Sequence, residues 1–412
     1  MYNLCMDLDL VRLNDWLSDY MNFERRPDKN QLNLSTMGIL CDYFGHPERF
    51  CPCFHVVGSK GKGTIAANIA GILSAAGYKV GIYASPHAYH FTERVRSATG
   101  PFHADIYYAA EDELKAGVAD LIGRGKVSKE ILTWFELVTI FAMLVFKEAK
   151  VDYAVYEVGM GGRLDTTNII SPKCISVGLI ELEHTKYLGD TLAKIAAEKA
   201  GVFKPGVPIF SVPQFKEASE VLDKAAKANS ATITYVPAGD YQTVDAEVAK
   251  LSVRSVLPET TDNIIKTGLS QVSLPARYEF IQNIPGYMLP FVLIDGAHTV
   301  NSIRVVVDRM KQDKISGHLL FGYGESGNVE EMAAILIKSN LFKKIYLTVP
   351  SVSKKSKLNR TAKAFSSSDK IEVASSDYEK VIEKALNDAS SEGVPLIVLG
   401  SFYLAGEVRK LI

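Results

Sequence analysis

The feature that most constrains the fold is a glycine-rich turn, GSKGKGT at residues 58–64, which stands between an apolar run and a helical pattern. Residues 54–57 (FHVV) lead into the turn, and residues 64–76 (TIAANIAGILSAA) follow it with isoleucine and leucine at helical spacing. Residues 79–84 (KVGIYA) form a second apolar run. This order predicts a βαβ unit with the glycine-rich turn at its first strand-to-helix junction.

The alternation of strands and helices recurs further along the chain. A helical pattern at residues 133–149 precedes a predicted strand at 151–158, and a helix at 190–200 lies between predicted strands at 174–180 and 207–212. Strands that alternate with helices are typical of a parallel sheet covered by helices on both faces. We therefore expect an α/β fold, although residues 213–272 carry a weaker pattern.

A second α/β pattern begins near Pro275. The predicted strands are 291–295, 317–322, 343–349 and 394–399, and the predicted helices are 299–312, 328–340 and 376–389. The polar tract 351–369 interrupts them and is predicted to be a solvated loop or helix. A chain of 412 residues is long enough for two or three domains. We expect two, residues 1–272 and 273–412.

Composition excludes some classes of partner. The chain has 46 basic and 47 acidic residues, whereas proteins that bind nucleic acid or a membrane surface usually carry a basic excess. No stretch approaches the ~18 uncharged apolar residues of a membrane span. The amino terminus has acidic residues where a signal peptide would be apolar, and five cysteines do not make a disulfide framework in a chain this long. We expect a cytoplasmic protein that binds neither nucleic acid nor a membrane.

The turn at residues 58–64 has the chemistry of a phosphate-binding loop. A glycine-rich turn before a helix lets backbone N–H groups point at phosphate oxygens, and the helix N-terminus adds a partial positive charge. Lys62 would reach the terminal phosphates. The strict GxxxxGK[ST] pattern is not met, because Val56 takes the first glycine position and Gly63 the hydroxyl position. A structural turn with solvent-facing lysines is the alternative.

Candidate magnesium ligands lie where predicted strands end. Ser85, Glu157 and His184 each follow an apolar strand. The carboxyl ends of strands in open α/β sheets are where ligands bind, and Mg²⁺ prefers oxygen ligands. Each residue alone is also compatible with a structural role. Lys199 lies among alanines in a predicted helix, which suggests close packing around it.

Seven segments of the chain resemble the successive motifs of the folylpolyglutamate synthases and dihydrofolate synthases, within the Mur ligase superfamily. They span residues 55–409 and read HVVGSKGKGT, YASPHAYHFTERVR, YEVGMGGRLDTTN, EHTKYLGDTLAKIAAEKAGVFKPG, PARYEFI, DGAHTVNS and GSFYLAGEVR. The resemblance implies an N-terminal P-loop ATPase domain with a parallel sheet, which also binds folate. It implies a C-terminal Rossmann-like α/β ligase domain after it.

The resemblance also implies an activity. Members of this family are ATP-dependent amide ligases that phosphorylate a carboxylate of folate or dihydropteroate, so that the amine of L-glutamate can displace phosphate. The implied cofactor is Mg²⁺, with ATP as co-substrate. We expect a monomeric folylpolyglutamate synthase that also acts as a dihydrofolate synthase.

Residues of this chain that match the family's motifs take the corresponding expected roles. The expected ATP-binding residues are Gly58, Lys60, Gly61, Lys62, Gly63, Thr64, Arg277, Asp295 and His298. The expected metal ligands are Ser85, Glu157, His184 and Lys199, the last as a carbamate. The expected pterin-binding residues are Thr133, Phe135, Glu136, Leu164, Asp165 and Thr166, beside a folate-binding loop at His87–Arg96. The residues expected to act in catalysis are Lys62, His184 and Lys199.

The chain departs from the family at a few positions. Glu183 replaces an aspartate, Ala276 replaces a glycine, and an ATP-contacting asparagine of the family falls near Asp245. Two other functions stay open. An inert nucleotide-binding protein would not need Lys62 together with the candidate metal ligands. A Mur-type peptide ligase usually has a separate nucleotide-sugar domain before the loop, for which the 57 residues before Gly58 leave no room.

Overall fold

The structure is a computed structural model of the chain. It describes residues 10–21, 34–87, 89–272, 274–323, 328–350 and 356–412. The chain forms two compact units, Met1–Val272 and Ser273–Ile412. Residues 1–9 of the predicted acidic amino terminus, residue 88 of the expected folate loop and residues 351–355 of the polar tract lie outside the described residues.

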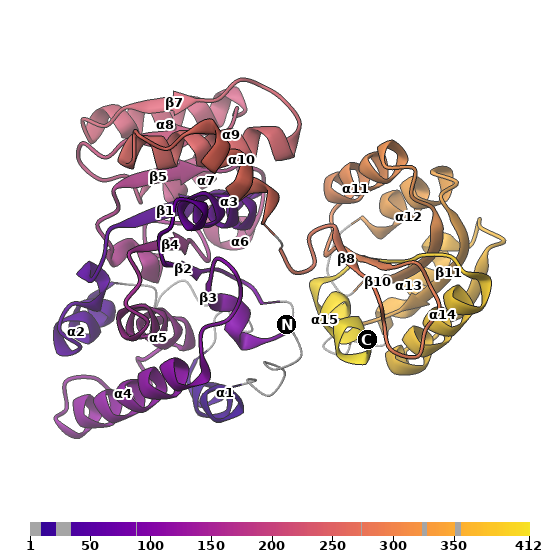
Figure 1. The fold of residues 1–412 in the computed structure, drawn as a ribbon, viewed down its shortest axis with the longest axis horizontal. Coiled ribbons are helices and arrows are strands. Elements are labelled where there is room, and N and C mark those ends of the chain that lie inside the picture. Colours follow the sequence, from indigo (N-terminus) through magenta and orange to yellow (C-terminus); the bar gives the residue numbers. More distant parts are fainter. Residues whose placement is uncertain (1–9, 22–33, 88, 273, 324–327, 351–355) are drawn as a thin grey trace. The chain divides into compact units, whose positions relative to one another are not determined.

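The first unit is built on a seven-stranded sheet with the order β3-β2-β4-β1-β5-β6-β7 (Figure 1). The strands are β1 (Cys53–Val57), β2 (Val80–Tyr83), β3 (Val95–Ser97), β4 (Tyr153–Glu157), β5 (Cys174–Val177), β6 (Ile209–Ser211) and β7 (Ile233–Tyr235). All neighbours pair in parallel except β2 and β3. Between β2 and β3 the described residues form only a short 3₁₀ helix, Phe91–Arg94, and the chain returns antiparallel, contrary to a purely parallel prediction.

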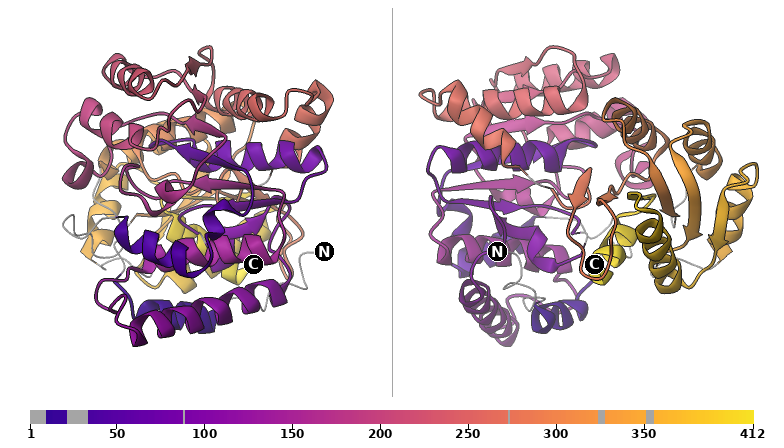
Figure 2. Two further views of the ribbon diagram at one scale, coloured as in Figure 1. Left: turned by 90° about the vertical axis from the view of Figure 1, so that its left-hand side faces the viewer. Right: turned by 45° about the vertical axis from the view of Figure 1, so that its right-hand side comes forward.

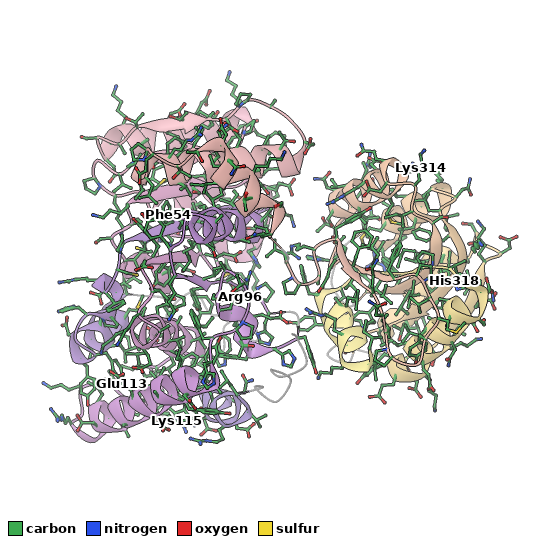
Figure 3. All side chains as sticks on the ribbon, in the orientation of Figure 1. Phe54, Arg96, Glu113, Lys115, Lys314 and His318 are labelled. Carbon is green, nitrogen blue, oxygen red and sulfur yellow. The ribbon has the colours of Figure 1, made fainter. Side chains whose placement is uncertain are left out.

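Helices cover both faces of this sheet (Figure 2). They are α1 (Val11–Ser18), α2 (Ser35–Tyr43), α3 (Lys62–Ala75), α4 (Ala104–Gly123), α5 (Trp134–Glu148), α6 (Thr185–Leu188), α7 (Leu192–Ala200), α8 (Lys216–Ala228), α9 (Tyr241–Val256) and α10 (Asp262–Ser270). Side chains alternate along β1. Phe54, labelled in Figure 3, and Val56 pack into the core with α3 and α9, whereas Cys53 packs with α5 and Val57 with α7 and α8. The central strand is therefore buried on both faces.

The weakly patterned segment 213–272 folds into α8, β7, α9 and α10. Helices α9 and α10 pack against α3, the helix that follows the glycine-rich turn. Gly71 of α3 meets Gly268 of α10, where a Cβ added to Gly71 would lie 2.7 Å from the Gly268 carbonyl oxygen. The two glycines let the backbones of α3 and α10 approach closely, so α10 packs against α3 on the side that faces away from the sheet.

The second unit contains a six-stranded sheet with the order β12-β11-β10-β13-β9-β8. Its strands are β8 (Glu279–Ile281), β9 (Val292–Ile294), β10 (Gly317–Gly322), β11 (Phe342–Thr348), β12 (Ile371–Ala374) and β13 (Leu396–Leu399). Only β8 runs antiparallel to its neighbour, within the described residues. The helices are α11 (Val300–Gln312), α12 (Val329–Lys338), α13 (Ser356–Phe365), α14 (Tyr378–Glu392) and α15 (Phe402–Leu411).

The expected fold class is confirmed: both units are α/β with mostly parallel sheets. The hydrophobic core of the second unit joins α11, α12 and α13 to one side of its sheet, while α14 and α15 pack on β10, β11 and β13. Among the described residues, no helix is long and apolar enough to cross a membrane.

Candidate active site

The candidate groups of the first unit follow neighbouring strands of its sheet. The order β2-β4-β1-β5 is parallel throughout. Ser85 follows β2, Glu157 ends β4, the glycine-rich loop follows β1, and the segment leading to His184 follows β5. Parallel strands end at the same edge, so these four pieces of chain stand side by side.

The glycine-rich loop is held against the end of β5. Ser59 N and Lys60 N both donate to the Leu179 carbonyl oxygen, at 2.8 Å and 2.9 Å. A Cβ added to Gly58 would lie 2.9 Å from Gly178 Cα, so only glycine permits this approach. Gly61 caps α3 in the left-handed region, with φ +82°. The loop thus delivers the chain directly into the N-terminus of a 14-residue helix.

Glu157 faces the first turn of α3. Its side chain is buried, and its Oε2 accepts a hydrogen bond of 3.2 Å from Ser85 N. The same oxygen lies 3.7 Å from the position of a Cβ added to Gly63. Residue 63 and the Glu157 carboxylate are therefore within van der Waals contact distance of each other. Two of the expected metal ligands and the loop are brought together here.

The buried Lys199 forms an ion pair with the partly buried Glu183 beside the same loop. Lys199 Nζ lies 2.7 Å from Glu183 Oε1 and donates to the Gly58 carbonyl oxygen at 2.8 Å. The lysine side chain is 1% exposed. His184 is exposed and adopts the left-handed region at φ 45°, where it caps the short helix α6. Glu183 was noted in the sequence only as a departure from the family, and its role as the partner of Lys199 was missed.

The pKa values show that these groups lie within one another's electric field. Burial lowers the pKa of Lys199 to about 8, against the attraction of Glu183. Burial by itself raises the pKa of Glu183, but Lys199 and Lys62 outweigh it and hold that pKa at about 2. Burial also lowers the pKa of His184, with Glu183 opposing and Lys199 and Lys62 adding to the shift. Lys62, the first residue of α3, thus acts on all three groups.

A second cluster joins the start of α5 to the segment after β4. Thr133 and Glu136 bond to each other in a capping box, with Glu136 Oε2 accepting from Thr133 N at 2.8 Å. The Phe135 ring lies against Gly159, where an added Cβ would be 2.3 Å from the ring. Thr166 Oγ1 lies 2.6 Å from Thr139 Oγ1 of α5. The expected pterin-binding residues on these two segments are therefore neighbours.

Asp165 is the buried anchor of the segment after β4. Its Oδ2 accepts from Gly159 N and Met160 N, each at 3.0 Å, and its Oδ1 accepts from Thr167 N at 3.0 Å and from the Thr167 hydroxyl at 2.5 Å. Burial raises the pKa of Asp165, and these hydrogen bonds oppose the shift. The Asp165 carboxyl group therefore holds the start of the glycine-rich segment 159–162 in place, and this role does not depend on a substrate. Leu164 beside it is half-buried.

His55 completes this network, and sequence reasoning did not identify it as a site residue. Its Nε2 lies 2.8 Å from Thr167 Oγ1. Because the Thr167 hydroxyl donates to Asp165, His55 Nε2 must carry the hydrogen and donate. Burial lowers the pKa of His55 to about 3, with Lys204 adding to the shift, so the ring is neutral. His55 on β1 thereby anchors the segment that follows the neighbouring strand β4.

The second unit gathers its expected residues at the end of β9. The buried Asp295 carboxylate accepts from Tyr278 N at 2.7 Å and Ala297 N at 2.8 Å. Burial raises its pKa, and the Arg277 charge opposes the shift. The Arg277 guanidinium lies 3.9 Å from the centre of the Phe402 ring. His298 Nδ1 lies 2.7 Å from the Gly296 carbonyl oxygen and must donate to it.

Ala276 in this unit adopts φ +53°, a region in which glycine has no steric cost. The glycine usual in the family would therefore fit there more easily.

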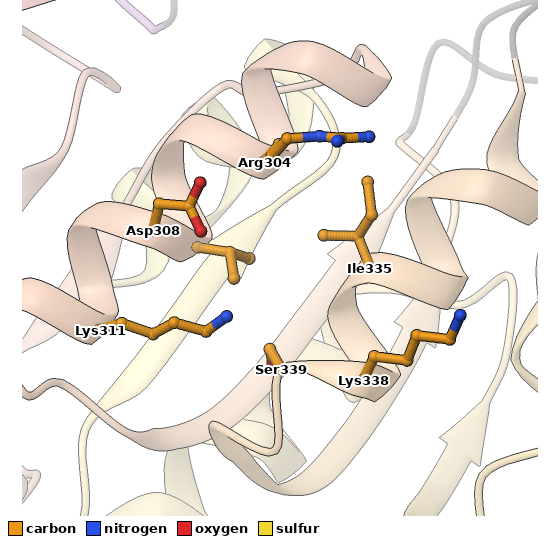
Figure 4. A pocket seen from close by; sticks show the side chains of 7 residues that line it. Arg304, Asp308, Lys311, Ile335, Lys338 and Ser339 are labelled. Carbon is orange, nitrogen blue, oxygen red and sulfur yellow. The ribbon is translucent and has the colours of Figure 1, made fainter. Parts of the chain in front are cut away.

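A separate pocket of the second unit lies between α11 and α12 and is lined by Arg304, Val307, Asp308, Lys311, Ile335, Lys338 and Ser339 (Figure 4). It contains none of the expected site residues.

A cluster of three or more His, Cys, Asp or Glu side chains able to hold a metal is absent from the part of the chain that the structure describes. The expected ligand set contains only two such residues, Glu157 and His184, and so does not depend on such a cluster. The carboxylate of Glu157 and the hydroxyl of Ser85 are oxygen donors that suit Mg²⁺. The Lys199 amine is not a ligand for Mg²⁺ and would become one only as a carbamate.

Known proteins resemble this chain in sequence and in fold. No protein-family model matches it. A dihydrofolate synthase/folylpolyglutamate synthase of Escherichia coli is 30% identical over 331 residues, which cover 75% of each chain. A folylpolyglutamate synthase structure from Mycobacterium tuberculosis, complexed with ADP and AMPPCP, superposes with a TM-score of 0.81 at 23% identity and covers 98% of each chain.

A third match is a solved Escherichia coli structure in complex with DHPP and ADP. It is 26% identical, has a TM-score of 0.77 and covers 97% of each chain. The 30% sequence identity to the Escherichia coli synthase and the matching fold over nearly the whole chain both indicate the same family. The chain belongs to the dihydrofolate synthase/folylpolyglutamate synthase family.

Proposed function

We propose that this chain uses ATP to join L-glutamate to a carboxyl group of a folate or of dihydropteroate. The observation that carries the proposal is the row of groups at one edge of the first sheet. A helix N-terminus and Lys62 stand at its centre, with Ser85 and Glu157 on one side and the Glu183–Lys199 pair on the other. Family membership supports the same chemistry, because relatives with this name are glutamate ligases.

The first step activates the carboxylate. A carboxylate oxygen of the folate or dihydropteroate attacks the terminal phosphorus of ATP, an acyl phosphate forms and ADP leaves. Backbone N–H groups of Gly61, Lys62 and Gly63 and the Lys62 ammonium would neutralise the charge on the transferring group. Mg²⁺, held by Ser85 and Glu157 with His184, would supply further neutralisation of the phosphates.

The second step forms the amide. The neutral amine of L-glutamate attacks the acyl carbon, the tetrahedral intermediate collapses, phosphate leaves and the amine gives up a proton. The protein's part is mostly to position the reactants and exclude water. The capping box of Thr133 and Glu136, with Phe135, Leu164, Asp165 and Thr166, would form one wall of the pterin site, supported by their contacts with one another.

The two units take separate roles in this proposal. The first, residues 1–272, would be the ATPase and folate-binding domain. The second, residues 273–412, would be the Rossmann-like ligase domain, with Arg277, Asp295 and His298 contacting nucleotide. Their grouping at the end of β9 supports this role. The proposal further describes a monomeric cytoplasmic enzyme that requires Mg²⁺.

Lys199 would act as a carbamate, formed when its neutral amine adds to carbon dioxide and loses a proton. Its nearly complete burial beside the loop supports this role. Incubation with ¹³C-labelled bicarbonate should give a carbamate resonance, and the Lys199→Arg variant should not. A spectrum without the resonance in the wild-type chain would remove Lys199 from the metal site.

The proposal is tested by measuring phosphate release from ATP with dihydropteroate and with tetrahydrofolate side by side, each with and without L-glutamate. We expect glutamate-dependent release with both substrates, because the pterin-site matches favour a bifunctional enzyme. Release with tetrahydrofolate alone would limit the chain to polyglutamate extension. Release that does not depend on glutamate with either substrate would overturn the proposal.

A further inference from the structure

A buried carboxyl group faces the phosphate loop from outside the row of expected ligands. Asp245 lies in the first turns of α9 and is 5% exposed. A Cβ added to Gly61 would lie 2.7 Å from its Oδ1 and 2.8 Å from its Oδ2. Both oxygens therefore face the residue that caps α3 and begins the proposed nucleotide site.

Among the described residues, Asp245 has no partner for a negative charge. No hydrogen bond or ion pair joins it to another described residue. The contrast with Asp165 is direct, since that equally buried carboxylate accepts four hydrogen bonds from Gly159, Met160 and Thr167. A helix N-terminus would favour an anion only through such N–H contacts or a nearby charge. An unpaired carboxylate in an apolar surrounding instead takes up a proton.

The elements around α9 supply no compensating charge. Helix α9 packs against α3, β5 and β6. Lys62 is the ionisable residue of α3, Cys174 that of β5, and Lys60 lies in the loop, and none of them bonds to Asp245. Burial raises the pKa of Cys174 to about 11, so that thiol is neutral. Burial likewise raises the pKa of Asp245 to about 8.

The charged side chains of α9 itself are engaged elsewhere. Glu247 pairs with Lys250 at 2.9 Å, and Arg254 pairs with Asp262 at 2.7 Å. Neither pair reaches Asp245. A polyanionic nucleotide placed at the loop would add negative potential near Asp245 and favour its protonated form further.

We propose that Asp245 is an uncharged carboxylic acid that donates a hydrogen bond to the bound nucleotide, so that nucleotide binding is linked to one proton at this residue. The inference rests on the proposed function, because it takes the loop to be the nucleotide site. Nucleotide binds the protonated form. In the nucleotide-free protein, Asp245 loses its proton at high pH. Above that pH a proton must be taken up each time nucleotide binds, and the affinity for nucleotide falls by up to about tenfold per pH unit.

The test measures the dissociation constant of AMPPCP with Mg²⁺ by calorimetry from pH 7 to pH 9.5. The wild-type chain should lose affinity above about pH 8. Asp245→Asn carries a permanent donor of the same shape, and its affinity should stay nearly constant across this range, exceeding that of the wild type at pH 9.5. Asp245→Ala lacks the donor, and its affinity should be about two- to tenfold weaker than that of Asp245→Asn at every pH, with an equally flat profile.

The Asn variant corrects for every pH effect that does not involve residue 245, ionisation of the nucleotide included, because such effects act equally on the two chains. Parallel pH profiles for the wild-type chain and Asp245→Asn would overturn the proton linkage while leaving the nucleotide site in place. Absence of AMPPCP binding by the wild-type chain at every pH would overturn the proposed function as well. A steeper profile for the wild type alone supports the inference.

Discussion

Lys199 Nζ lies 2.7 Å from Glu183 Oε1, and this buried ammonium also donates to the carbonyl oxygen of Gly58. The lysine loses almost all contact with water, so its charge depends on this one carboxylate and one backbone oxygen. A carbamate on Lys199 would place an anion next to Glu183. The ion pair therefore belongs to the unmodified lysine.

Removing the carboxylate should destabilise the protein. Glu183→Gln leaves a buried ammonium without a counter-ion, and we expect the free energy of unfolding to fall by about 2–4 kcal/mol in urea titrations. Asp190→Asn is the matched control, because Asp190 pairs with Lys194 at 2.8 Å with both side chains well exposed. That change should leave the urea midpoint nearly unchanged, because exposed ion pairs contribute little to stability. Equal effects of the two substitutions would show that the Lys199–Glu183 pair is not buried as described.

The hydroxyl of Thr167 should matter more for the folate substrate than for ATP. Thr167→Val leaves His55 Nε2 without a partner and removes one of the two hydrogen bonds that Asp165 Oδ1 accepts, and we expect a loss of about 1–3 kcal/mol in stability. The loosened segment after β4 should raise the KM for the folate substrate while the Kd for AMPPCP changes little. Thr234→Val, in the exposed part of β7, serves as the control. If the KM for the folate substrate and the Kd for AMPPCP rose together, the network would support the nucleotide site as well as the folate site.

Lys62 should be needed for turnover but not for folding. Its side chain is partly exposed at the start of α3, so Lys62→Ala should change stability by less than about 0.5 kcal/mol. Loss of its charge should lower kcat by about 10²–10³-fold or more. Lys79→Ala, at an exposed position after the same helix, should keep full activity in the phosphate-release assay. An active, folded Lys62→Ala enzyme would place the phosphates elsewhere.

Asp245 should make the stability of the protein depend on pH. Its pKa is raised from 3.8 to about 8 by burial, so the folded state keeps a proton that the unfolded state releases above about pH 4. Stability attributable to this group is present in acid and is lost by up to about 1.4 kcal/mol per pH unit as pH rises towards 8. Asp245→Asn should therefore gain stability over the wild type between pH 5 and pH 8. Identical pH dependence of urea midpoints for the two chains would contradict this.

Much of the fold could be predicted from the sequence because its main elements carry strong local patterns. The run 54–57, the glycine-rich turn and the helix after it became β1, the loop and α3. The antiparallel edge strands β3 and β8 were missed, because each has only three residues and pairs through a chain reversal. Helices α9 and α10 were unclear because much of their burial comes from contact with α3.

The contacts that hold the site together lie far apart in the sequence. His55 and Thr167 are 112 residues apart, and no local pattern connects them. Glu183 was visible as an unusual residue, but its role depends on Lys199, which lies 16 residues further along the chain in α7. The position of Asp245 next to Gly61 likewise arises only when α9 packs on α3. Residue types could be predicted, whereas their partners required the fold.

The central claim is that ATP activates the substrate carboxylate as an acyl phosphate. The most direct measurement uses a folate substrate labelled with ¹⁸O in the reacting carboxylate, together with ATP and L-glutamate, followed by mass spectrometry of the released phosphate. An acyl phosphate predicts that one labelled oxygen passes to each phosphate. Amide product formed alongside unlabelled phosphate would contradict the account.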